Sequence, residues 1–341
     1  MPGGKDAGPY ERLAVRSRLG GPNGERAELS IAVSSQDGEM RGINFWDLDK
    51  TLLLAEPIHA KAVDQIFPAF AESRESRDEL HKVYFNGFAL GNSFREWDRM
   101  WRIYGEGQNQ YKDVRVYETE FMGNDNPKQK LIDEPGHGEG YHERANEILQ
   151  RYGRIAYDVM RKEYEKDPEE FQKGFLKPEM LQLLIEKSRL GQASVYMTAN
   201  QKDFARGLVA FSGLYKYGLA LATDETMAGG GKEVAIRNLI KELGDMGLRV
   251  NKKRAAAIGD SIKGDVGSGA REELGSGVLV VEATDDPNAI MARAKGNNPD
   301  GEQLRAIFEQ TNVEAIPTEE VGKSKHGVYR FGKRSSQAEQ E

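Results

Sequence analysis

Apolar residues along the chain follow two rhythms, short continuous runs and runs spaced by three or four positions. Continuous apolar runs of strand length lie at 42–47, 193–198, 218–222, 254–259 and 278–281. Helical spacing of apolar residues lies between them, over 201–213 and 232–243. Strands that alternate with helices are typical of a parallel sheet covered on both faces. The pattern therefore predicts an α/β fold with helices on both faces of a parallel sheet.

The stretch between the first two of these strands has a different pattern. Helical spacing predominates from about 55 to 190, and strand signals are few. Two helical stretches stand out there, one over 141–166 and one that follows Pro178 and closes at Gly191. We therefore expect a mainly helical second domain over 56–189, inserted into a core made of 41–55 and 190–315.

Both ends of the chain have the composition of tails. Residues 1 to about 25 are rich in Gly, Pro, Arg and Glu and lack a sustained periodicity, which is typical of a mobile segment. Alternating Leu29, Ile31 and Val33 mark a candidate edge strand after it. We expect an N-terminal tail over 1–40 that contains this strand, and a C-terminal tail over 316–341.

Composition narrows the class of protein. The 341 residues suffice for one large or two ordinary domains. The net charge of −7 offers no basic surface for nucleic acid or an anionic membrane, and no apolar run approaches the ~20 residues that span a bilayer. The absence of cysteine excludes a disulfide framework and a thiolate metal site. Without a signal-peptide pattern at the start, a cytoplasmic protein is predicted, and the sequence does not indicate its oligomeric state.

The strand at 42–47 leads into a pair of acids. Asp47 and Asp49 are two positions apart, so on a continuing strand both side chains would point the same way. Crowded carboxylates repel each other and are normally kept only where a cation or a proton relieves the repulsion. One acid of such a pair can act as a covalent nucleophile and the other as a proton shuttle. The alternative is a strand end whose acids merely cap a turn.

Further polar residues follow a strand or open a helix. Thr198 ends the strand at 193–198, and Ala199 and Asn200 lead into the next helix. A hydroxyl and free backbone N–H groups at this place could hold a phosphoryl oxygen, and Thr198 could also cap the helix; the two roles can coexist. Lys232 opens a helix after three glycines, where the helix dipole disfavours a cation unless an anion is bound beside it.

Two more acids follow the strand at 254–259. Asp260 comes directly after Gly259, which lets the backbone turn sharply, and Asp265 follows shortly. Ligands of open parallel sheets bind outside the carboxyl ends of the strands, so Asp47 and Asp260 would converge there. Mg²⁺ suits such a place because it prefers oxygen ligands. Taken alone, Gly-Asp-Ser would be an ordinary turn.

In chain order these residues are Asp47-x-Asp49-x-Thr51, Thr198, Lys232 and Gly259-Asp260-x4-Asp265. The set resembles the four motifs of the haloacid dehalogenase-like (HAD) superfamily of phosphotransferases, each in the expected strand or helix context. The resemblance covers about residues 41–55 and 190–290 and implies a Rossmann-like sheet. It also implies that 56–189 is the helical cap that many members insert after the first motif.

The resemblance implies the roles of the acids. Asp47 would attack phosphorus and form an aspartyl-phosphate, while Asp49 would protonate the leaving oxygen and later deprotonate the hydrolytic water. Asp49 argues against a dehalogenase, since carbon–halogen cleavage needs no acid at the leaving group. Mg²⁺ would be held by Asp47, the backbone carbonyl of Asp49, and Asp260, and would screen the charge between two anions.

The resemblance also implies which residues would hold the phosphoryl group. Thr198, Ala199 and Lys232 would bind its oxygens. The supporting residues would be Thr51, Asn200 and Asp265. Asp265 would orient Lys232 or a metal-bound water.

The sequence thus predicts a Mg²⁺-dependent phosphatase whose substrate is a small-molecule phosphate ester, without a nucleic-acid or membrane partner. A phosphomutase would share every motif and remains open. A protein phosphatase would need an open cleft, which the insertion at 56–189 argues against. A non-catalytic binding protein on the same fold is a further alternative, although all the acids of the motifs are present. The motifs do not indicate which ester is bound.

Overall fold

The described part of the chain falls into two compact units. The computed structural model describes residues 10–66, 141–227, 231–282, 312–318, 321–323 and 329–331. One unit combines Met1–Ala55 with Arg161–Glu341, and the other is Glu56–Met160. The described elements of the second unit are α1 (Glu56–Ile66) and most of α6 (Tyr141–Lys166). Residues 67–140, much of the expected cap, lie outside the described residues.

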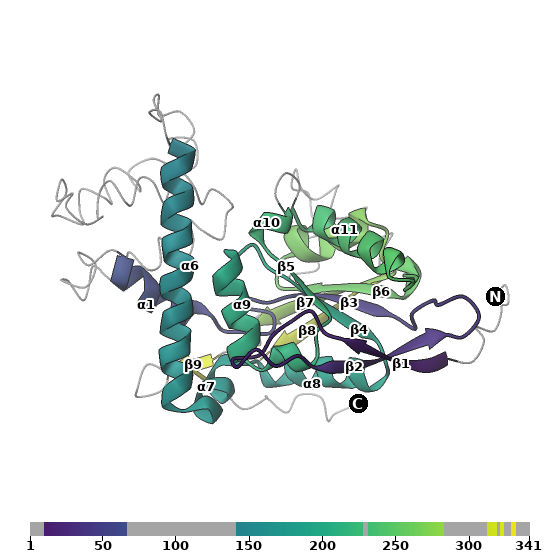
Figure 1. The fold of residues 1–341 in the computed structure, drawn as a ribbon, viewed down its shortest axis with the longest axis horizontal. Coiled ribbons are helices and arrows are strands. Elements are labelled where there is room, and N and C mark those ends of the chain that lie inside the picture. The colour runs from purple at the N-terminus through teal and green to yellow at the C-terminus, as the bar shows by residue number, and fades with distance from the viewer. Residues whose placement is uncertain are drawn as a thin grey trace. The chain divides into compact units, whose positions relative to one another are not determined.

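A parallel sheet of six strands forms the centre of the first unit (Figure 1). In spatial order its strands are β5 (Ala220–Ala222), β4 (Ala193–Met197), β3 (Ile43–Asp47), β6 (Ala255–Gly259), β7 (Ser276–Glu282) and β8 (Asn312–Thr318). All neighbouring strands run parallel. This confirms the predicted α/β fold with a parallel sheet, and each predicted apolar run forms a strand of it.

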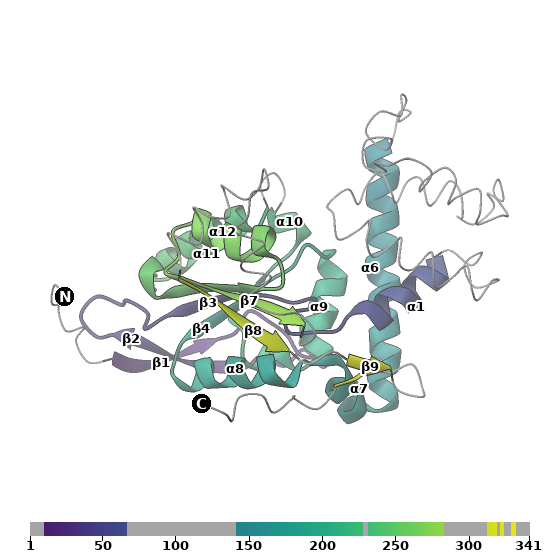
Figure 2. The ribbon, with the colours of Figure 1, turned by 180° about the vertical axis from the view of Figure 1, so that it is seen from behind.

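Helices cover both faces of this sheet (Figure 2). α8 (Pro178–Arg189) and α9 (Lys202–Phe211) precede β4 and β5 and cover one face. α11 (Gly231–Asp245) and α12 (Gly267–Arg271) precede β6 and β7 and cover the other. Crossovers between parallel strands are right-handed, so the helices change face where the chain reverses its direction across the sheet. The remaining short helices of the first unit are α7 (Pro168–Phe175), α10 (Asp224–Met227), η2 (Leu214–Lys216), η3 (Lys252–Arg254) and the π-helical η4 (Ile262–Val266).

β3 lies between β4 and β6, and its complete burial explains its continuous apolar run. Phe45 packs into the core cluster that contains Ile236 of α11. Trp46 faces the opposite side, where its indole N–H donates to the Ser194 hydroxyl at 3.1 Å. Side chains alternate along a strand, so Asp47 shares the α11 side with Phe45.

The N-terminal segment is a two-stranded ribbon, so the predicted tail is wrong for residues 10–16. β1 (Tyr10–Arg16) pairs antiparallel with β2 (Glu28–Ser34), which is the strand predicted at Leu29–Val33. β2 is not an edge of the main sheet, because its partner is β1. Most side chains of β1 are exposed, and its sequence carries no sustained apolar alternation. The side chain of Ile31 in β2 is part of the hydrophobic core and anchors the ribbon there.

The boundary between the two units lies within α6, between Met160 and Arg161, whereas the expected cap runs to residue 189. α7 and α8 therefore belong to the same unit as the sheet. Here the backbone N–H of Lys177 donates to the Leu52 carbonyl at 2.9 Å. This contact connects the start of α8 to the turn after β3.

The sheet also extends beyond the expected core end at residue 315, because β8 continues to Thr318 and pairs with β7. β9 (Val321–Lys323) and β10 (Tyr329–Phe331) then form an antiparallel pair within the predicted C-terminal tail. Among the described residues, none of the helices combines the length and the apolar character that crossing a membrane requires.

Gly275, just before β7, lies against the backbone that leads into β6. A Cβ at this position would lie 2.1 Å from the carbonyl oxygen of Lys253. A backbone oxygen cannot turn aside as a flexible side chain can. Gly275→Ala should therefore lower the free energy of unfolding by about 1–3 kcal/mol, the usual cost of overpacking. Urea unfolding of the variant and the wild type measures this difference.

Gly244 in α11 provides the matched control, because a Cβ there meets open space and the residue is exposed. Gly244→Ala should raise the free energy of unfolding by about 0.5–1 kcal/mol, since alanine favours a helix over glycine. Equal stability of Gly275→Ala and the wild type would contradict the close approach of the two backbones.

Candidate active site

A sharp turn at the end of β3 separates the two acids of the first motif. β3 ends at Asp47, and the Leu52 N–H closes the turn by donating to the Leu48 carbonyl at 2.9 Å. Lys50 adopts a left-handed backbone conformation with a φ of 57°. Asp49 therefore does not continue the strand. The expectation that both carboxylates point the same way assumed a continuing strand, and the turn removes that condition.

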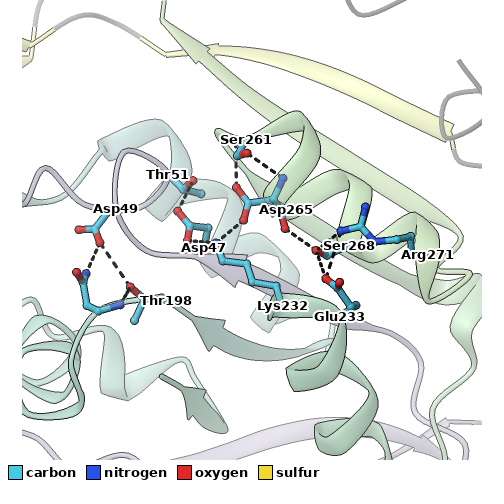
Figure 3. Close-up of polar contacts among 12 residues, drawn as sticks. Asp47, Asp49, Thr51, Thr198, Lys232, Glu233, Ser261, Asp265, Ser268 and Arg271 are labelled. Atoms are coloured by element: carbon cyan, nitrogen blue, oxygen red, sulfur yellow. Dashed lines mark hydrogen bonds and ion pairs between the residues drawn. The ribbon is translucent and has the colours of Figure 1, made fainter. Parts of the chain in front are cut away.

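Asp47 lies beside a lysine from α11 (Figure 3). Its Oδ1 forms an ion pair with Lys232 Nζ, which also pairs with Oδ1 of Asp265. The side chains of Asp47, Lys232 and Asp265 are 8%, 14% and 1% exposed. The Thr51 hydroxyl donates to Oδ2 of Asp47 at 3.3 Å. One ammonium thus joins two buried carboxylates from β3 and from the segment after β6.

Asp49 is held by residues that follow β4. The Asn200 side-chain amide donates to Oδ2 of Asp49, and the Thr198 hydroxyl lies 3.5 Å from the same oxygen. Among the described residues, Oδ1 of Asp49 is buried and has no hydrogen-bond partner. Burial raises the pKa of Asp49 to about 6, although the hydrogen bond from Asn200 acts to lower it. Ala199, directly after Thr198, is exposed.

The ion pairs change the proton affinities of their members. Burial raises the pKa of Asp47 well above its ordinary value, against the opposing effect of Lys232 and with the support of the nearby Asp265 carboxylate. Burial acts to lower the pKa of Lys232, but the Asp47 and Asp265 carboxylates outweigh it and raise that pKa. The lysine is therefore positively charged throughout the physiological pH range.

Asp260 completes an acidic cluster with Asp47 and Asp265. One carboxylate oxygen from each of the three lies within 4.8 Å of the others. Burial of the carboxyl group and the adjacent Asp265 raise the pKa of Asp260 to about 6, although the residue keeps contact with solvent. Carboxylates that share a place favour protons when no cation relieves their repulsion. The donors are all oxygens, which Mg²⁺ prefers, so these residues fit the predicted metal.

Gly259 makes room for Asp265. A Cβ at position 259 would lie 2.1 Å from Oδ2 of Asp265. That oxygen accepts a hydrogen bond from the Ser261 backbone N–H at 2.9 Å. Gly259 is predicted from the sequence to allow a sharp turn, but it is not among the described glycines with positive φ. The need for glycine is therefore one of space.

Three residues beside the cluster belong to none of the sequence motifs. Glu233 follows Lys232 in the first turn of α11 and contacts Ser268 and Arg271 of α12. An acid in the first turn of a helix is common, because it complements the helix dipole. Glu233 is therefore unremarkable in the sequence, and its partners become visible only when the two helices are placed side by side.

The family model of haloacid dehalogenase-like hydrolases matches residues 44–271. This range covers the site from Asp47 to Asp265, and it is more than half of the chain. The chain belongs to the haloacid dehalogenase-like hydrolase family. The match confirms the resemblance that the four motifs indicate. A search among curated proteins finds no match to this HAD hydrolase.

Several solved structures are similar to this HAD hydrolase at low sequence identity. CbbY from Rhodobacter sphaeroides, in complex with phosphate, is 15% identical with a TM-score of 0.41, over 70% of this chain and 85% of its own. YfnB from Bacillus subtilis, bound to magnesium, is 14% identical with a TM-score of 0.39, over 70% and 88%. A HAD phosphatase from Thermococcus onnurineus is 18% identical with a TM-score of 0.40, over 80% and 100%.

The acidic cluster predicts how pH and Mg²⁺ affect stability. The pKa values of Asp47, Asp49 and Asp260 are raised, so without a cation the folded protein binds protons more tightly than the unfolded chain. The contribution of these three groups to stability should therefore fall as the pH rises from about 4 through 6. Because Mg²⁺ takes the place of protons, it should raise the thermal midpoint more at about pH 8 than at about pH 5. Thermal unfolding in chelator and in Mg²⁺ measures both effects.

A pair of variants controls this measurement. Asp260→Asn removes one carboxylate of the cluster and should reduce the shift caused by Mg²⁺. Asp245→Asn, at the exposed end of α11, should leave that shift unchanged. A shift of equal size at both pH values, or one of undiminished size in Asp260→Asn, would be at odds with a metal site in this cluster.

Proposed function

We propose that this HAD hydrolase is a Mg²⁺-dependent phosphatase that hydrolyses a small phosphate monoester through an aspartyl-phosphate intermediate. The observation that best supports this proposal is the contrast between the surroundings of Asp47 and Asp49. Asp47 contacts the ammonium of Lys232, whereas Asp49 contacts the Asn200 side-chain amide. Burial raises the pKa of both carboxyl groups in the absence of a metal, that of Asp49 to about 6. Two carboxylates in unlike environments are suited to unlike roles, one as a nucleophile and one as acid and base.

Asp47 is the nucleophile of the proposed reaction. Its carboxylate is oriented by contacts of both oxygens, with Lys232 at Oδ1 and Thr51 at Oδ2. Attack of a carboxylate oxygen on phosphorus forms the acyl-phosphate bond and breaks the bond between phosphorus and the alcohol oxygen. The ammonium of Lys232, the hydroxyl of Thr198 and the backbone N–H of Ala199 would stabilise the charge on the phosphoryl oxygens.

Asp49 serves as the general acid and then as the general base. In its protonated form it gives a proton to the departing alcohol oxygen, which becomes the free alcohol. The resulting carboxylate then removes a proton from a water molecule that attacks phosphorus, and this releases phosphate and restores Asp47. A pKa of about 6 suits both steps near neutral pH, because each protonation state is accessible.

The metal is assigned to the acidic cluster. Asp47, Asp260 and the backbone carbonyl of Asp49 would hold Mg²⁺, and Asp265 would support Lys232 beside it. When bound, Mg²⁺ offsets the negative charge that carboxylates and a phosphate group share. Without such a cation, burial raises the pKa of Asp47. A bound metal would favour the charged carboxylate and so lower this pKa.

A cytoplasmic location remains a prediction. The substrate is proposed to be a small molecule. A net charge of −7 disfavours nucleic acid as a partner. A phosphomutase would share these residues and differ in the fate of the phosphoryl group, which would pass to an alcohol instead of water. The ratio of free phosphate to isomerised ester, measured over a panel of sugar phosphates with Mg²⁺, separates the two reactions.

Substitution of the two acids tests the mechanism. Asp47→Asn should abolish hydrolysis of para-nitrophenyl phosphate, because an amide is a poor nucleophile at phosphorus. Asp49→Asn should slow turnover by roughly 10²–10⁴-fold, the usual contribution of a general acid or base. This variant should accumulate aspartyl-phosphate, because water is no longer deprotonated, and mass spectrometry of acid-quenched protein detects the added phosphoryl group.

Asp245→Asn, at the exposed end of α11, serves as the control for a surface carboxylate and should keep wild-type turnover. Full activity of Asp47→Asn would refute the covalent mechanism. A wild-type protein that releases no phosphate from any tested ester, although it binds Mg²⁺, would favour the non-catalytic alternative.

A further inference from the structure

A second set of polar contacts joins α11 to α12, next to the ion pairs of Lys232 (Figure 3). Oε2 of Glu233 lies 2.9 Å from the Ser268 hydroxyl and 3.2 Å from Nη2 of Arg271. Arg271 also donates to the Ser268 hydroxyl at 3.1 Å. We refer to Glu233, Ser268 and Arg271 as the α11–α12 clamp. None of the three belongs to the motifs that identify the family.

The clamp is connected to Asp265 through the intervening π-helix. The single proton of the Ser268 hydroxyl is shared between Oε2 of Glu233 and the Gly264 carbonyl oxygen, which lies 2.6 Å from the hydroxyl oxygen. The Gly264 N–H donates to the Ser261 hydroxyl at 2.9 Å. The Ser261 N–H in turn donates to Oδ2 of Asp265 at 2.9 Å. A π-helix is rare and is often found at functional sites. Here Gly264, within the π-helix, contacts the hydroxyl of Ser261 before it and the hydroxyl of Ser268 after it.

α11 thus contacts the segment after β6 through two consecutive side chains. Lys232 reaches Asp265, and Glu233 reaches Ser268. Ser268 is 1% exposed, so its hydroxyl is held in a buried place. Burial acts to raise the pKa of Glu233, but hydrogen bonds from its own backbone amide, Ser268 and Arg271 hold that pKa below its ordinary value. Glu233 is therefore a carboxylate at neutral pH.

We propose that Glu233, through Ser268, is a positioning residue that fixes the Ile262–Val266 segment and thereby the placement of the Asp260 and Asp265 carboxylates. Glu233 does not touch the reacting atoms. The proposal deepens the proposed function and rests on it for its effect on turnover. Its effect on metal binding is measured without turnover.

The test is a calorimetric titration of the purified protein with Mg²⁺. Glu233→Ala should raise the dissociation constant for Mg²⁺ about tenfold, the lower end of the effect of losing an outer-shell partner. Glu233→Gln keeps an oxygen that can accept a hydrogen bond from Ser268 and should recover most of the affinity. A purely structural role would change the thermal midpoint and leave the dissociation constant unchanged.

Glu242 provides the matched control, because it also lies on α11 and pairs with an arginine, Arg18, at 2.6 Å. Glu242→Gln should not change the dissociation constant. Ser268→Ala should weaken Mg²⁺ binding in the same direction as Glu233→Ala. The double variant should be no worse than the more impaired single variant, since the two residues act through one contact. Turnover of para-nitrophenyl phosphate at limiting Mg²⁺ should follow the dissociation constant, with little change in KM.

An unchanged dissociation constant in Glu233→Ala or in Ser268→Ala would overturn the proposal, as would an equal loss in Glu242→Gln. If Glu233→Ala does not fold, Ser268→Ala decides the question. A wild-type protein that binds no Mg²⁺ would overturn it as well. A wild-type protein that binds Mg²⁺ but hydrolyses no ester would refute the proposed function alone, and the calorimetric comparison would still decide the role of Glu233.

Discussion

The arrangement of the site depends on one buried ammonium. Lys232 lies in the first turn of α11, where the helix dipole disfavours a cation, yet it pairs there with Asp47 and Asp265. Without it two buried carboxylates would face each other with no counter-charge, which typically costs about 3–5 kcal/mol. The side chain of Lys232 therefore connects the start of α11 to the end of β3 and to the segment after β6. In the proposed reaction, the ammonium of Lys232 also stabilises the negative charge of the phosphoryl group.

The order of the strands explains why the site forms at this place. β3 lies between β4 and β6, and the helices change face between these two neighbours. In open α/β sheets ligands bind at such a point, outside the carboxyl ends of the strands. Asp47 contacts Lys232 of α11 on one side, and Asp49 contacts Asn200, which follows β4, on the other. The turn after β3 thus distributes two neighbouring acids between the two halves of the sheet.

Much of the sheet could be predicted from the sequence, because buried parallel strands are continuous apolar runs. Asp47, Thr198 and Asp260 could be identified because they end or directly follow those runs, and Lys232 because it opens a helix where a cation is disfavoured. β1 could not, since its side chains are mostly exposed and it gains order only by pairing with β2. The left-handed conformation of Lys50 is unusual for a residue with a side chain and has no local signal. The contact between Glu233 and Ser268 depends on the spacing of two helices, which no pattern within either helix encodes.

The N-terminal ribbon has a consequence for the synthesis of this chain. The Ser17 hydroxyl bonds to the Gly218 carbonyl, and the Arg12 guanidinium bonds to the Arg189 carbonyl, so these partners are separated by 201 and 177 residues. β3 likewise cannot pair until β4 and β6 have been translated, and both follow much later in the chain. Contacts between such distant segments form slowly, and the unpaired strands of a growing chain are open to wrong partners. The strand that carries Asp47 therefore leaves the ribosome well before β4 and β6, the two neighbouring strands that enclose it.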